Sequence, residues 1–222
     1  TVNANDASTT VTFEYGLTAG YGTTVTATQS PVTGTADTAV SIALTSLTPN
    51  TTYHYRVKGV NDGGTTNGGD LTFTTPAVAP TATSNAASGI STTGATLNGT
   101  INANNASTTV TFEYGPTTAY GTTVTAAQSP VTGTADTPVS AAIAGLTPIT
   151  TYHYRVVGQN SGGTANGLDQ SFTTLTPPPT VTSNAATNVS STGATLNGTV
   201  NANDASTTVS FEYGMTNAYG AT

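Results

Sequence analysis

Hydrophobic and polar side chains alternate in two related runs of the chain. Residues 47–57 read Leu-Thr-Pro-Asn-Thr-Thr-Tyr-His-Tyr-Arg-Val, and residues 146–156 repeat this run with Ile in place of Asn. The proline fixes the backbone φ angle at a corner. The alternation that follows, with a period of two residues, predicts a half-buried β-strand. Each run is therefore a turn that leads into a strand.

A single spacing relates the whole chain to itself. Phe13, Phe112 and Phe211 stand 99 residues apart, and residues 29–38 return letter for letter as residues 128–137. Such self-similarity is the signature of a repeat protein. A repeat of this length matches one seven-stranded β-sandwich of about 100 residues.

The Leu-x-Pro-x-Thr-x-Tyr part of the run resembles the tyrosine corner of fibronectin type III domains, where the Tyr hydroxyl bonds back to upstream backbone at the start of strand F. The resemblance covers the whole chain and implies an all-β fold of tandem seven-stranded immunoglobulin-like (fibronectin type III-like) β-sandwiches. The chain has no Trp, so the usual core Trp of strand B is missing, and we expect Leu97 and Ile101 to fill its space. This departure indicates Thr- and Gly-rich bacterial relatives in secreted and surface proteins. The corner residues that the resemblance implies are Leu47, Pro49, Tyr53, Leu146, Pro148 and Tyr152.

The repeat predicts one complete domain between two partial ones. We expect residues 1–75 to hold strands C to G, residues 81–174 to form a complete domain, and residues 180–222 to hold strands A to C. The proline-bracketed segments 76–80 and 175–179 are predicted to be short, semi-rigid linkers. Expected strands are C at 11–15, C′ at 23–28, E at 39–44, F at 53–60 and G at 71–75 in the first repeat, with A near 82–84 and B at 95–102 in the second.

The partial repeats leave two explanations open. The sequence is either a window of a longer array, or the trailing strands of one chain complete the leading repeat of the next by donor-strand complementation. Residues 199–222 nearly duplicate residues 1–24. A complementing pair would therefore carry strand C twice, which favours the window.

Composition and charge narrow the partners. Only 6% of the residues are charged, against about 25% in an average protein. The net charge is −7, and the only cations are Lys58, Arg56 and Arg155. Three cations cannot neutralise a nucleic-acid backbone or dock the chain on an anionic membrane, and no apolar run reaches the roughly 18 residues of a membrane span. Nucleic-acid binding and membrane insertion are therefore not expected. The absence of Cys excludes disulfides and thiolate metal sites.

Charged side chains on the predicted outer face suggest ion pairs. Glu14 should pair with Arg56, and Glu113 with Arg155, because strands C and F are neighbours in this fold. Each surface pair would contribute only about 0–1 kcal/mol. The alternative interpretation, a catalytic carboxylate, would need a second acid a few ångströms away in a cleft, and the pattern offers none.

Histidines and a Gly-rich segment could suggest metal sites. His54 and His153 lack further ligands at metal-binding spacing, so exposed strand positions are the simpler interpretation. Residues 61–70 superficially resemble a calcium loop but lack the acid spacing and closing Glu of an EF-hand. We expect a hairpin there, with no metal and no cofactor.

Two features suggest contact with sugars. An exposed Tyr after strand C could stack on a sugar ring, although packing over the sheet edge explains these residues equally well; the weak candidates are Tyr21, Tyr120 and Tyr219. Asn-x-Ser/Thr patterns and the threonine-rich surface make attached glycans a further candidate. The patterned residues are Asn50, Asn98, Asn105, Asn188 and Asn197.

The function most consistent with these features is structural. Near-identical repeats, stiff linkers and the lack of a nucleophile–base pair or metal cluster favour an extracellular or cell-surface array without catalytic activity. Such an array would form a fibre, filament or stalk, with copies of itself as partners. The alternative is a spacer, or a carbohydrate- or adhesion-binding module, of a larger secreted enzyme or adhesin.

Overall fold

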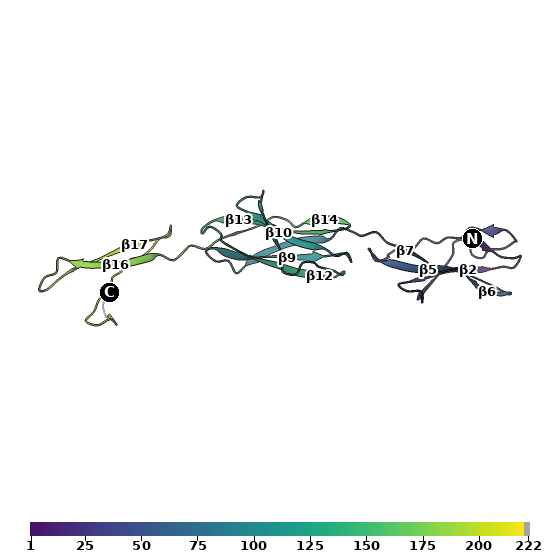
Figure 1. Cartoon of the computed structure of the whole chain (residues 1–222), viewed down its shortest axis with the longest axis horizontal. Helices are drawn as coiled ribbons and strands as arrows, with labels where there is room; N and C mark the ends of the chain where they lie inside the picture. The colour runs from purple at the N-terminus through teal and green to yellow at the C-terminus, as the bar shows by residue number, and fades with distance from the viewer. Residues whose placement is uncertain (220–222) are drawn as a thin grey trace.

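The computed structural model describes residues 1–219, within which every regular element is a β-strand. The strands lie in three groups along the longest axis of the molecule (Figure 1): β1–β7, β8–β15 and β16–β17. Within residues 1–219 we find no helix with the length and hydrophobicity that a membrane crossing requires.

The middle group is a two-layered sandwich. One sheet has the strand order β12-β9-β8, and the other β11-β10-β13-β14, with β15 also paired to β13. All pairs are antiparallel. The bounds are Thr81–Ser88 (β8), Gly94–Asn102 (β9), Thr109–Gly115 (β10), Thr122–Thr125 (β11), Asp136–Ala144 (β12), Thr151–Asn160 (β13), Gly163–Asn166 (β14) and Gln170–Thr173 (β15).

In fibronectin-type lettering, the first sheet consists of strands A, B and E, and the second of C′, C, F and G. Strand G is divided into β14 and β15, so seven lettered strands occupy eight segments. The predicted G covered only the second segment. The division falls at Gly167, where a Cβ atom would lie 2.3 Å from Ser84 Oγ of the opposite sheet. The predicted all-β, fibronectin type III-like sandwich is confirmed.

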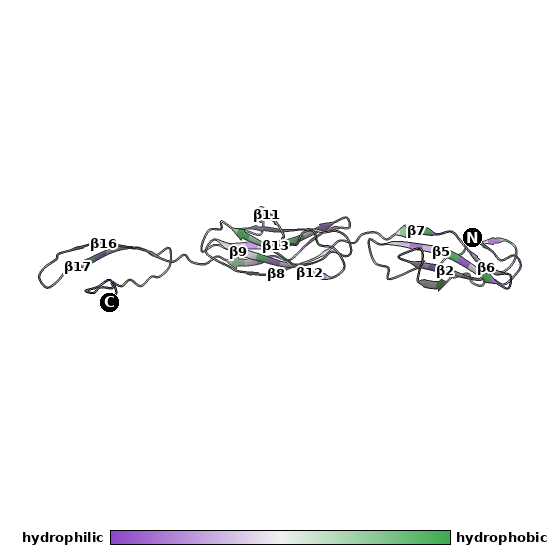
Figure 2. Cartoon of the chain, turned by 60° about the horizontal axis from the view of Figure 1, so that its bottom comes forward, coloured by the Kyte–Doolittle hydropathy of each residue, from purple (hydrophilic) through white to green (hydrophobic). Residues whose placement is uncertain are grey.

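The core lies between the two sheets of the middle group. Along β9, every second residue is buried, and Leu97 and Ile101 are fully buried, as expected in place of a strand-B Trp. Phe112, Tyr154 and Val156 from the opposite sheet are also fully buried. Hydrophobic and hydrophilic positions are interspersed along the strands (Figure 2), because one side chain of each pair faces the core and the next faces water.

The first group forms one sheet of the sandwich but only a trace of the other. Its main sheet has the order β3-β2-β5-β6, with β7 paired to β5. The bounds are Val2–Asn3 (β1), Thr10–Gly16 (β2), Thr23–Thr26 (β3), Asp37–Thr38 (β4), Thr52–Asn61 (β5), Gly64–Asn67 (β6) and Leu71–Thr74 (β7).

The predicted strand E at residues 39–44 is wrong for the first group, because these residues are irregular. In the middle group the equivalent strand, β12, pairs with β9 at nine successive positions. The first group has only β1 to take the place of β9, and β1 pairs with β4 at two positions. Without a partner strand, the ladder stops after Thr38.

The third group is a hairpin of β16 (Thr180–Thr187) and β17 (Thr195–Asn201), equivalent to strands A and B. The predicted strand C is wrong for this group: residues 209–213 contain a single bridge residue and no strand. In the middle group strand C pairs with strand F at seven positions, and the third group has no strand F within the described residues.

Candidate functional sites

The tyrosine corners tie the E–F turn to strand F. The Tyr53 hydroxyl accepts a hydrogen bond of 3.1 Å from the Thr48 N–H, and Tyr152 makes the same bond to Thr147. The Tyr53 ring stacks on Phe73 with centroids 5.6 Å apart. Leu146 is buried at the start of the second corner, and Leu47 at the start of the first is half-buried.

The prolines of the corners precede a residue with unusual backbone. Asn50, after Pro49, has φ of 47°, and Ile149, after Pro148, has φ of 51°. Asn adopts this left-handed conformation readily, whereas a β-branched residue does so only under strain. The two corners therefore share a geometry that suits Asn better than Ile.

A polar network covers the outer face of the sheet in the first group. The Arg56 Nε donates to Glu14 Oε2 over 2.7 Å, and Lys58 Nζ lies 3.4 Å from Glu14 Oε1. His54 Nδ1 lies 2.8 Å from Asp70 Oδ2, and the Tyr21 hydroxyl donates to Asp70 Oδ1 over 3.0 Å. We call Glu14, Tyr21, His54, Arg56 and Asp70 the face cluster.

The same face cluster exists in the middle group. Arg155 Nε donates to Glu113 Oε2 over 2.8 Å, while Asp169 contacts both His153 and Tyr120, at 2.8 and 3.1 Å. The sequence analysis paired the Glu and Arg residues but missed the Asp. The signal available was its spacing of 16 residues from the His in both repeats.

The loop after strand C places the Tyr of the face cluster. Tyr21 has φ of 58°, and a Cβ atom at Gly16 would lie 1.6 Å from the Tyr21 carbonyl oxygen. The loop thus closes only over a glycine. It brings the Tyr21 ring beneath the Arg56 guanidinium, whose carbon lies 4.8 Å from the ring centroid. Tyr120 lies 5.0 Å below Arg155 in the same manner, so an arginine covers one face of each ring.

Electrostatics within the face cluster favour the charged carboxylates. The hydrogen bond from Arg56 holds the pKa of Glu14 below its ordinary value, and the hydrogen bond with His54 lowers the pKa of Asp70. Desolvation raises the pKa of Tyr21, and its bond to Asp70 adds to this effect. The groups satisfy one another, and the result is a clamp across strands C, F and G.

The third Tyr candidate lies apart from any such network. Tyr219 has φ of 49° and is 54% exposed. The third group provides no strand F to carry an arginine over its ring.

The segment 61–70 forms a hairpin between β5 and β6. Asn61 Oδ1 accepts from the Gly63 N–H over 2.9 Å, and Asp70 belongs to the face cluster. No set of three or more His, Cys, Asp or Glu side chains within residues 1–219 is arranged to hold a metal ion.

Asn side chains pin the first linker at its two ends. Asn50 Nδ2 donates to the Asn105 carbonyl over 2.8 Å, and Asn105 Nδ2 donates back to the Pro49 carbonyl and to Thr51 Oγ1 over 3.1 and 2.9 Å. The linker itself is held by Asn104 and Asn160, whose Nδ2 atoms donate to the carbonyls of residues 79 and 78 over 2.7 and 3.1 Å. These reciprocal bonds join the first and middle groups, and the Nδ2 atoms of two glycosylation candidates take part in them.

Two further glycosylation candidates are engaged within hairpins. Asn98 Nδ2 donates to the Ala86 carbonyl over 2.9 Å, and Asn197 Nδ2 to the Ala185 carbonyl over 2.8 Å. Asn188 Nδ2 donates to Thr195 Oγ1 over 3.3 Å. A glycan on any of these nitrogens would replace a proton that now bonds within the fold.

The second linker is held less completely. Asn203 Nδ2 donates to the Pro178 carbonyl over 2.6 Å, which matches the bond of Asn104 in the first linker. Ile149 and Asp204 stand where the first junction has Asn50 and Asn105. The reciprocal pair of amides is thus absent there.

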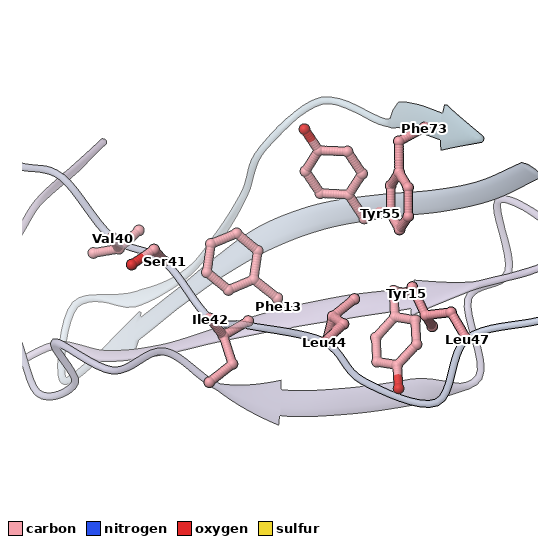
Figure 3. A pocket seen from close by; sticks show the side chains of 9 residues that line it. All are labelled: Phe13, Tyr15, Val40, Ser41, Ile42, Leu44, Leu47, Tyr55 and Phe73. Atoms are coloured by element: carbon pink, nitrogen blue, oxygen red, sulfur yellow. The ribbon is translucent and has the colours of Figure 1, made fainter. Parts of the chain in front are cut away.

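An apolar hollow of about 490 Å³ opens on the first group. Phe13, Tyr55 and Phe73 from the sheet and Ile42 and Leu44 from the irregular segment gather around it (Figure 3). In the middle group the equivalent of this space is occupied by the sheet that holds β8 and β9. We call the hollow the open face.

Comparisons with known proteins follow from this geometry. No protein-family model matches the chain. Endoglucanase B of Cellulomonas fimi is 35% identical over 165 residues, which are 68% of this chain and 15% of that protein. The chain thus spans a small part of the length of this relative.

Two solved structures were also matched. The sensor domain of the anti-sigma factor RsgI4 from Pseudobacteroides cellulosolvens is 26% identical, covering 42% of this chain and 92% of that one, with a TM-score of 0.34. The FN1–FN3 domains of chicken CNTN1 are 19% identical, covering 77% of this chain and 57% of that one, with a TM-score of 0.31. At these TM-scores the likenesses add nothing to the architecture given by strand pairing. The chain is similar to a segment of a much longer bacterial protein.

Proposed function

We propose that the chain is a non-catalytic array of β-sandwiches that acts as a stiff spacer or stalk in a larger extracellular protein of bacterial origin. The observation that carries the proposal is the first junction, where amides from both groups bond across a proline-bracketed linker. A linker of this kind fixes the distance between the parts that it joins.

The similarity to part of an endoglucanase supports this proposal. The shared segment is a minor share of that protein, as expected of a spacer between larger parts. The face clusters supply no cleft with paired acids, and their carboxylates are bonded to arginine, histidine and tyrosine.

Small-angle X-ray scattering tests the stiffness. We expect a rod-like profile whose maximum dimension stays constant with temperature, because the junction amides hold the linker. Replacing residues 76–80 with a Gly-Ser segment should shorten the average dimension and broaden its distribution. A native profile that matches the Gly-Ser variant would overturn the proposal.

Catalysis is tested separately. We expect no release of reducing sugar from soluble cellulose by the purified chain. Release above that of a heat-denatured sample would overturn the non-catalytic part of the proposal and leave the stiffness to be judged on scattering alone.

A fibre is the second candidate function. The open face favours it, because a sheet surface that lacks its cover can receive one from another chain. The geometry of that contact is developed below.

A further inference from the structure

The hairpin β16–β17 repeats the hairpin that covers the middle group. β16 differs from β8 at two of eight positions, Val181 for Ala82 and Thr187 for Ser88. The seven residues of β17 differ from the last seven of β9 only by Val200 for Ile101. The two hairpins are thus nearly the same module in two settings.

The settings differ in what the hairpin covers. Leu97 and Ile101 are fully buried in the middle group, whereas Leu196 and Val200, their equivalents, are 40% and 37% exposed. Val181 on β16 is 72% exposed. The third group therefore presents an apolar hairpin face without a partner sheet among the described residues.

The open face of the first group is the matching surface. Its strand C, β2, is identical in sequence to β10, and the core-facing Tyr55 and Val57 of β5 repeat Tyr154 and Val156 of β13. The surface that holds β8–β9 in the middle group is thus reproduced around the hollow of the first group.

The middle group shows which polar bonds seat the hairpin. Ser84 Oγ accepts from the Val156 N–H over 3.1 Å, and the Tyr154 hydroxyl donates to the Asn85 carbonyl. The third group carries the same donors and acceptors on its hairpin, as Ser183 and Asn184. Their partners, the Val57 N–H and the Tyr55 hydroxyl, stand at the open face.

We propose that the open face is a receptor for the β16–β17 hairpin of a second copy of this chain, so that copies join head to tail by strand complementation. The joined hairpin would give residues 39–44 the neighbour that strand E lacks. The segment 175–179 would then lie between two complete sandwiches, as segment 76–80 does within one chain. This inference does not depend on the spacer function.

Two short segments must yield for the hairpin to seat. The strand β1, which pairs at only two positions, occupies the place that residues 200–201 would take. Residues 202–222 of the donor duplicate residues 4–24, which the acceptor already supplies, and they must remain outside. Deleting residues 202–222 should therefore strengthen association.

The test uses single charges on either surface. In Leu196→Asp the donor face carries an acid but the open face is intact; in Leu44→Asp the reverse holds. Each chain is refolded from urea at about 100 µM, so that β1 can exchange, and its mass is followed by sedimentation velocity. We expect the native chain to give a series of multiples of the monomer, and each variant to stay monomeric.

Mixing the two variants separates head-to-tail joining from other association. The intact hairpin of Leu44→Asp should fill the intact open face of Leu196→Asp, which yields a dimer and nothing larger. Thr195→Asp is the matched control, because it adds the same charge on the opposite face of β17 and should leave the series unchanged.

A peptide of residues 180–201 provides a readout that does not depend on variant folding. Added in excess, it should occupy the open face, lower the average mass of the native chain and protect residues 39–44 from hydrogen exchange. A native chain that stays monomeric, a series unaffected by Leu196→Asp or by the peptide, or an equal loss in Thr195→Asp would each overturn the proposal.

Discussion

Truncation of Leu97 tests the core of the middle group. This side chain is fully buried on β9 and belongs to the single core cluster of the sandwich. Leu97→Ala should lower the free energy of unfolding by about 3–5 kcal/mol, because it removes buried methyl groups and leaves a cavity that the packed sheets close only in part. A domain of this size is stable by roughly 5–14 kcal/mol, so the loss is a large share of the total.

Urea unfolding followed by tyrosine fluorescence measures this loss. With a slope of about 1–3 kcal/mol per molar urea, we expect the midpoint to fall by about 2 M. Hydrogen exchange of the peptide that spans residues 94–102 assigns the transition to the middle group. The assay is run at low micromolar concentration, where chains stay separate.

The chain contains its own control for this prediction. Leu196 is the same residue in the third repeat but is 40% exposed, so Leu196→Ala should change the free energy of unfolding by no more than about 0.5 kcal/mol. A midpoint for Leu97→Ala within about 0.3 M of the native value, or equal losses in both variants, would refute the reasoning that burial between the sheets determines the cost.

Three further predictions concern single sites. Ile149→Asn should raise the melting temperature of the middle group by about 5 °C, since Asn tolerates the left-handed backbone that Ile adopts here; calorimetry checks this, and a lower melting temperature would contradict it. Tyr152→Phe should cost about 1–2 kcal/mol through the lost corner hydrogen bond, and an unchanged urea midpoint would argue against this role of the hydroxyl. The lowered pKa values of Glu14 and Asp70 imply stability that is complete above their ordinary pKa of about 4 and is lost as the pH falls through the lowered values. Urea midpoints between pH 7 and 2 should show this loss in the native chain and a weaker one after Glu14→Gln with Asp70→Asn, whereas parallel profiles would exclude the carboxylates as its source.

The sequence predicts the fold because its local signals agree. Alternation marks the strands, the Leu-x-Pro-x-Thr-x-Tyr run marks the corner, and Leu97 and Ile101 carry the core position left by the missing Trp. Each signal depends on neighbours within a few residues, or on a spacing that recurs with the repeat.

The misses share a physical cause. Residues 39–44 and 209–213 have strand-like sequences, yet they stay irregular because a β-strand is stabilised by its partner's hydrogen bonds. Pattern alone does not say whether the partner is present. The division of strand G at Gly167 depends on close approach to Ser84 of the other sheet, which no local pattern encodes.

The candidate site was predicted in part. The Glu–Arg pairs follow from strand adjacency, but Asp70 and Tyr21 join them only through the break in strand G and a glycine-closed loop. Both are tertiary features. The junction amides of Asn50 and Asn105 appeared in the sequence only as glycosylation patterns.

The division of strand G has a mechanical consequence. The two linkers leave the middle sandwich at opposite ends of its long axis (Figure 1), so tension enters at β8 and leaves at β15. β8 is paired with β9 at six positions, whereas β15 is paired with β13 at four. Resistance to pulling depends on the rate of unfolding, and the shorter ladder shears first. Under load, the last strand of each sandwich yields before the rest and lengthens the chain stepwise, as a sacrificial link does in a rope.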